Sequence, residues 1–151
     1  MADQFNILSK GRKLILKLIE GLTIEQLNKI PESCNNNIVW NIAHLVVTQQ
    51  LLCYKLSGLQ MLVSEEMVSK YKKGTSPSNK VTLEEFEAIK KMFLNLPKQF
   101  EEDYGKGKFK SYQSYTTSVD VTLTNIKSAC AFNNFHEGIH LGVILGLKKL
   151  I

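Results

Sequence analysis

The chain has 151 residues, of which 44% are hydrophobic and 22% are charged, a balance typical of a globular protein and not of a disordered one. At this length we expect a single domain that spans residues 1–151. The formal net charge is +5, and lysines occur in short clusters at residues 70–73 and 106–110, both beside glycines. A nucleic-acid binder more often shows a basic stripe or a recognisable motif, so we predict no nucleic-acid partner.

The three cysteines, Cys34, Cys53 and Cys130, are widely spaced and form no C-x-x-C motif. This pattern argues against a disulfide framework and against a cysteine-based zinc site, and free thiols suggest a reducing compartment. The N-terminus lacks a signal-peptide pattern, and the longest apolar stretch, residues 141–147, is shorter than the ~20 residues that span a bilayer. We therefore expect a cytoplasmic protein with no membrane partner.

Apolar residues recur at helical spacing over residues 5–19, which predicts an amphipathic helix. Its expected polar face is basic and contains Lys10, Arg12, Lys13 and Lys17. Thr23 with Gln26 three positions later forms a capping-box pattern, so a short helix is predicted before Pro31.

A long and mostly apolar run from Ile38 to Leu56 follows three asparagines that can cap a helix, and it ends at Ser57-Gly58. The run predicts a helix whose wide apolar stripe places it centrally in the fold. Residues 59–80 are expected to form a connection with a short helix near residues 65–70.

Thr82 and Glu85 form a second capping-box pattern, and the apolar stripe behind them predicts a helix through Asp103. Pro97 lies inside this pattern and is expected to kink or split the helix.

Residues 105–110 should form a loop, and residues 112–117 either an extended segment or a loop. A last long helix is predicted from Thr122 to about Lys149. Its glycines at positions 138, 142 and 146 destabilise a helix, which suggests that another helix packs closely against that face. Four substantial helices predict an all-α protein, an antiparallel helical bundle in which the connection at 59–80 permits a crossover.

All three histidines of the chain lie on predicted helices. His136 and His140 are separated by four positions, so their side chains lie one turn apart on one helix face, and His44 lies on the central helix. Neutral imidazole is the commonest metal ligand at neutral pH, so the sequence points to a three-histidine metal site.

Other interpretations of these residues stay open. Residues 136–140 match the H-E-x-x-H pattern of zinc proteases, but the eleven residues that follow contain no further ligand, and no strand-built cleft is predicted. A histidine on an apolar helix face is also often only a hydrogen-bonded core residue. Glu137 either reaches a metal-bound water, or it faces solvent or forms a salt bridge. Asn133 either orients a ligand or makes a buried polar contact. Trp40 is expected to pack in the core.

Two segments carry a family resemblance: Trp40-Asn41-Ile42-Ala43-His44-Leu45 and Phe132-Asn133-Asn134-Phe135-His136-Glu137-Gly138-Ile139-His140-Leu141-Gly142. In this order and separation they resemble the DinB-like (DinB/YfiT) superfamily over essentially the whole chain. The resemblance implies a four-helix bundle in up-down-down-up order, often a homodimer. It also implies one divalent metal ion, with zinc and nickel as the leading candidates, bound by His44, His136 and His140.

The resemblance suggests two functions of different classes. The first is a metal-dependent enzyme acting on a small molecule, such as a hydrolase or an S-transferase that uses a low-molecular-weight thiol like bacillithiol or mycothiol. Three protein ligands leave an open coordination position, which is typical of catalytic zinc. The second is a non-enzymatic stress-response or binding protein whose metal site is structural or vestigial.

Overall fold

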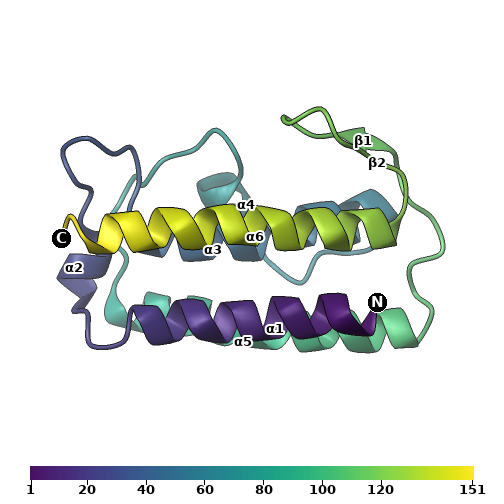
Figure 1. Ribbon diagram of the computed structural model, residues 1–151, viewed down its shortest axis with the longest axis horizontal. Coiled ribbons are helices and arrows are strands. Elements are labelled where there is room, and N and C mark those ends of the chain that lie inside the picture. The colour runs from purple at the N-terminus through teal and green to yellow at the C-terminus, as the bar shows by residue number, and fades with distance from the viewer.

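The computed structural model describes all 151 residues as a predominantly helical molecule, in agreement with the predicted all-α class. Four long helices dominate it: α1 (Ala2–Leu18), α3 (Ile38–Gln49), α5 (Leu83–Gly105) and α6 (Ile126–Lys148). Figure 1 shows α6 in front of α3 in one layer and α1 in front of α5 in the other. No helix combines the length and the apolar character needed to cross a membrane.

Contacts between the helices fix their relative directions. Asn134 donates to the carbonyl of Gln4 at 3.0 Å and Lys148 to that of Leu18, so α1 and α6 run parallel. By contrast, α1 and α5 are antiparallel, because the ring of Phe5 packs against Phe100 at 5.1 Å while Arg12 lies over Phe93.

The run beginning with α3 opposes α6 in direction. Asn41 contacts His140, and Leu52, three turns farther along, shares an apolar cluster with Ala129. This run continues past α3 as a π-helical turn, η1 (Gln50–Tyr54), and a 3₁₀ turn, η2 (Lys55–Ser57). It ends at Gly58, whose φ of 71° is the left-handed conformation that glycine adopts without strain.

The remaining elements are short. They are α2 (Ile24–Asn28), α4 (Glu65–Tyr71) and an antiparallel hairpin of β1 (Tyr115–Thr116) and β2 (Thr122–Leu123). The hairpin pairs Tyr115 with Leu123 and Thr116 with Thr122. Residues 112–117 are therefore extended in part, one of the two predicted alternatives.

The capping signals in the sequence are confirmed. Thr23 and Thr82 each form a complete capping box with the side chain three positions later. The side chain of Asn37 accepts a hydrogen bond from the Trp40 amide at 2.8 Å and starts α3 at the predicted position. These local hydrogen bonds satisfy amides that the first turn of a helix leaves without partners.

The predicted start of the last helix is wrong by four residues. Its N-cap is Asn125, whose side chain accepts from the amides of Lys127 and Ser128, whereas Thr122 and Leu123 belong to β2. Leu123 is an apolar residue at a position that fits the helical pattern, but it lies in β2 and its side chain is buried in the core from there.

The expected effect of Pro97 is corrected in one respect, because α5 is continuous through this residue and does not split. Proline has no amide hydrogen and cannot bond to the carbonyl four residues earlier, which is that of Phe93. Arg12 Nη1 donates to this carbonyl at 3.0 Å instead. A side chain from α1 therefore supplies the hydrogen bond that the proline removes.

This contact also corrects the placement of Arg12 on a solvent-facing basic surface, because its side chain is completely buried. Arg12 lies between Leu8 and Ile15 on α1, which belong to different apolar clusters. The larger cluster fills the end of the molecule near Phe93 and Ile144. The smaller cluster, which includes Phe5 and Phe100, fills the opposite end. A buried polar layer therefore separates two apolar cores.

The close helix approach expected at the glycines of α6 does not occur within the chain. Apart from the neighbouring residues and backbone of α6 itself, no atom lies within 4 Å of a Cβ placed on Gly138, Gly142 or Gly146. This face of α6 is instead open to solvent.

Candidate metal centre

The fold brings all three histidines together. His44 comes from α3 and the His136–His140 pair from α6, and one ring nitrogen of each lies within 4.8 Å of the others. The Nε2 atoms of His136 and His140 are 3.1 Å apart. Two nitrogens that each lie ~2.1 Å from a tetrahedral zinc ion are roughly 3.4 Å apart, so the observed separation suits two ligands of one ion.

The hydrogen bond of His44 determines which of its nitrogens is free. Its Nδ1 lies 2.7 Å from the backbone carbonyl of Tyr71. A carbonyl oxygen can only accept, so Nδ1 carries the proton and Nε2 keeps its lone pair. Nε2 then faces the other histidines and the hydroxyl of Thr48, which lies 3.3 Å away.

His140 is also oriented by a hydrogen bond, because its Nδ1 lies 2.7 Å from Oδ1 of Asn41. The amide nitrogen of Asn41 donates to Oδ1 of Asn36 and to the carbonyl of Asn37, which identifies the atom facing the imidazole as the oxygen. Nδ1 of His140 is therefore the donor, and its Nε2 is an acceptor. Such outer hydrogen bonds orient imidazole ligands and make them more basic.

His136 completes the set through its Nε2, while its Nδ1 is buried without a hydrogen-bond partner. Three imidazole nitrogens thus converge, two of them with lone pairs fixed by their partners. This donor set fits a divalent metal ion, and the three histidines can hold one.

Burial keeps these rings neutral. Desolvation, followed by the neighbouring histidines, lowers the pKa of His136 to about 3. Desolvation and the proximity of His44 lower the pKa of His140 to about 4. Burial also lowers the pKa of His44, against the opposing effect of its bond to Tyr71. At neutral pH the rings are therefore in the form that binds metals.

Trp40 fixes the plane of the His44 ring. It is buried, and the two rings stack 4.7 Å apart at an angle of 10°. Its indole nitrogen donates to the hydroxyl of Thr75 at 3.2 Å. Trp40 therefore packs in the interior as expected, and the residue that it packs against is a metal-ligand candidate.

The sequence model of the DinB superfamily matches residues 7–144, most of the chain. The chain belongs to the DinB superfamily. No curated protein matches it.

The other two candidate residues of this DinB-superfamily chain do not face the histidine cluster. Arg12 Nη2 donates to Glu137 at 2.7 Å and Arg12 Nε lies 3.1 Å from both carboxylate oxygens. Asn133 donates to the same carboxylate at 3.0 Å. Glu137 therefore makes a buried salt bridge, and Asn133 makes a buried polar contact. A carboxylate bound in this way is not free to act as the base of an H-E-x-x-H protease.

A cavity of about 290 Å³ opens beside the histidines, with His44 and His136 in its wall. Leu51, Leu52, Leu56 and Phe132 supply an apolar side, and the polar side includes Thr48. No carboxylate lines it.

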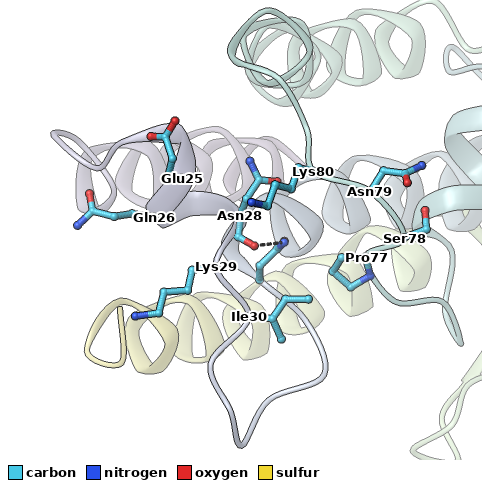
Figure 2. A pocket seen from close by; sticks show the side chains of 10 residues that line it. Glu25, Gln26, Asn28, Lys29, Ile30, Pro77, Ser78, Asn79 and Lys80 are labelled. Atoms are coloured by element: carbon cyan, nitrogen blue, oxygen red, sulfur yellow. Dashed lines mark hydrogen bonds between the residues drawn. The ribbon is translucent and has the colours of Figure 1, made fainter.

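A wider cleft of about 550 Å³ lies near α2, away from the histidines. In Figure 2 the side chains of Glu25, Gln26 and Lys29 point in different directions and do not converge on one place. It has only one hydrophobic lining residue. The cavity beside the histidines is therefore the better candidate for a ligand site.

Sequence reasoning missed the groups that orient the histidines. Asn41 lies inside the motif around His44 and its amide could have been suspected. Thr48 lies four positions after His44, so helical spacing alone could have placed its hydroxyl beside the ring. The Tyr71 carbonyl has no signal in the sequence, because only the folded connection brings Tyr71 back to α3.

Proposed function

We propose that this protein is a metal-dependent enzyme that acts on a small molecule, with one zinc or nickel ion bound by His44, His136 and His140. The observation that carries the proposal is the convergence of three neutral imidazoles beside a cavity whose wall includes His44 and His136. Three protein ligands leave a coordination position for a substrate, and two of the three line the cavity in which that substrate would lie.

Among the candidate reactions, thiol-dependent transfer suits the cavity better than hydrolysis. His44, His136 and His140 would hold the divalent metal, which when bound would lower the pKa of a coordinated thiol and so make the thiol a nucleophile at neutral pH. Hydrolysis would be helped by a carboxylate that takes a proton from water, but Glu137 is bound to Arg12 and no carboxylate lines the cavity. The chain's own contribution is to position the ligands and to exclude water with its leucine side chains.

The experiment uses protein loaded with zinc or nickel, a panel of low-molecular-weight thiols and an alkyl halide as the electrophile. In the expected reaction the thiolate sulfur forms a bond to carbon, halide leaves, and the thiol proton goes to the buffer. Thioether formation above the uncatalysed rate, abolished in His44→Ala, supports the proposal. No acceleration with any thiol or metal contradicts it.

A second function, non-enzymatic binding with a structural metal, is favoured by one observation. His44 and Trp40 tie α3 to the segment around Tyr71 and Thr75 through hydrogen bonds. A metal at His44 would therefore hold this segment in place. Removal of the metal with a chelator separates the two functions: a collapse of the melting temperature indicates a structural metal, whereas loss of thiol binding alone indicates an open site.

We also propose that the protein is a cytoplasmic homodimer that uses the exposed face of α6. Between Ser128 and Leu147 this helix has one charged residue, Glu137, which is buried. The solvent-facing residues are instead apolar or glycine: Ala131, Phe135, Gly138, Ile139, Gly142, Val143, Leu145 and Gly146. Such a face is unusual on a monomer, and the glycines leave space for a second backbone.

The helix directions described above support the assignment of the fold to a single-domain four-helix bundle in up-down-down-up order, the arrangement that the family resemblance implies. In that arrangement α1 and α6 point one way, and α3 and α5 the other.

A further inference from the structure

The cavity beside the histidines has a charge pattern that the metal centre does not require. Lys55 from η2 and Lys73 from the segment after α4 both line it. Neither lysine makes an ion pair or a side-chain hydrogen bond within the chain, although four other lysines are paired with carboxylates. Since no acidic residue lines the cavity, these two positive charges are not neutralised.

The two lysines are carried by backbone that is tied to the metal centre. Lys73 lies two residues after Tyr71, whose carbonyl accepts from His44. Thr75 fixes the other side of the turn, because its hydroxyl bonds to the carbonyls of Lys70 and Lys72. Lys55 belongs to the same helical run as His44. The positions 44, 48, 51 and 55 are separated by four, three and four residues, and this helical spacing keeps their side chains on the face that lines the cavity.

The rest of the wall is arranged to suit one kind of ligand. Leu52, Leu56 and Phe132 offer an apolar surface, while Thr117 and Ser118 from the hairpin place hydroxyl groups in the wall. A flexible ammonium group binds carboxylate or phosphate as a point charge, and a concave wall with unbalanced positive charge raises the local concentration of anions.

We infer that the cavity binds a small amphiphilic anion whose charged group lies between Lys55 and Lys73 and whose apolar part packs on Leu52, Leu56 and Phe132. The inference rests on the proposed function only in placing the other end of the ligand at the three histidines. It makes the two lysines the determinants of specificity for acidic over neutral substrates.

The test uses cobalt-loaded protein and a series of ω-mercapto acids with two to five methylene groups, each compared with the mercaptoalcohol of the same length. Binding is read from the thiolate-to-cobalt absorption. Acids should bind about 10-fold more tightly than the matched alcohols, as expected for two partly exposed charge pairs. Lys55→Met and Lys73→Met should each reduce this preference to roughly 3-fold, and the double variant should abolish it. Lys98→Met removes an exposed lysine from α5, outside the cavity, and should change nothing.

Equal binding of acids and alcohols to the wild-type protein, with both lost in His44→Ala, would overturn the anion site and leave the metal site intact. If no thiol binds, hexanoate and hexanol are compared by amide chemical shifts. Shifts at Thr117 and Ser118 with hexanoate alone, absent in the double lysine variant, support the anion site independently of the proposed function. Their absence overturns it.

Discussion

The buried ion pair of Arg12 and Glu137 makes Arg12→Met the most informative substitution outside the metal centre. Methionine fills a similar volume but leaves Glu137 as a buried charge with only Asn133 as a partner. It also leaves the carbonyl of Phe93 without the donor that Pro97 makes necessary.

Removing one member of a buried, hydrogen-bonded ion pair destabilises a protein by about 3–5 kcal/mol. For a domain of this size each kcal/mol corresponds to ~2–4 °C, so the melting temperature should fall by roughly 6–20 °C. The assay is urea unfolding of the metal-free protein followed by circular dichroism, in which the midpoint falls while the slope is unchanged.

Two further variants identify the cause of the loss. Arg12→Met/Glu137→Leu removes both charges of the buried pair, so the double variant should be more stable than Arg12→Met alone. Pro97→Ala restores an amide that can bond to the Phe93 carbonyl, so it should stabilise the Arg12→Met protein by about 1 kcal/mol more than it stabilises the wild type. A loss below about 1 kcal/mol in Arg12→Met, or a double variant that is less stable than the single one, would refute this reasoning.

Three other outcomes are expected. Asn41→Leu removes the acceptor that orients His140 and should weaken metal binding about 10- to 100-fold in a chelator competition, whereas Asn41→Asp keeps an acceptor and should lose less. Because folding lowers the pKa of His136 to about 3 and of His140 to about 4, from 6.5, the unfolded chain takes up protons that the folded chain does not. The metal-free protein should therefore lose stability as the pH falls from 6.5 towards 4. Because the rings are already neutral, metal binding near pH 6 should release few protons, as measured by calorimetry in buffers of different ionisation enthalpy. Release of two or more protons per ion would count against neutral rings. Phe135→Lys and Val143→Lys place charges on the exposed face of α6, so each should convert a dimer to a monomer in light scattering, with Lys98→Met as a control. An unchanged mass in both lysine-introducing variants would exclude this face as the dimer interface.

Local signals in the sequence predicted most of the helical elements. Capping at Thr23, Asn37 and Thr82 depends on side chains within three residues of the helix start, so it can be recognised without the fold. The same signal at Asn125 and Ser128 marks the start of α6, but the apolar residue at 123 extended the helical pattern past it.

The polar interior could not be predicted in the same way. Arg12 stands among exposed lysines in the sequence, and its burial depends on Glu137, which is 125 positions away, and on the carbonyl exposed by Pro97. The convergence of the histidines was expected from their motifs and the family resemblance. By contrast, their tautomers depend on Asn41 and on the Tyr71 carbonyl, and these contacts exist only in the folded chain.

The most direct test of the account is the metal content of protein purified without a histidine tag, measured by elemental analysis beside His44→Ala. Three converging imidazoles predict close to one zinc or nickel ion per wild-type chain and almost none in the variant, with both proteins folded by circular dichroism. A wild-type protein that retains no metal after incubation with either ion, or a variant that retains as much as the wild type, would contradict it.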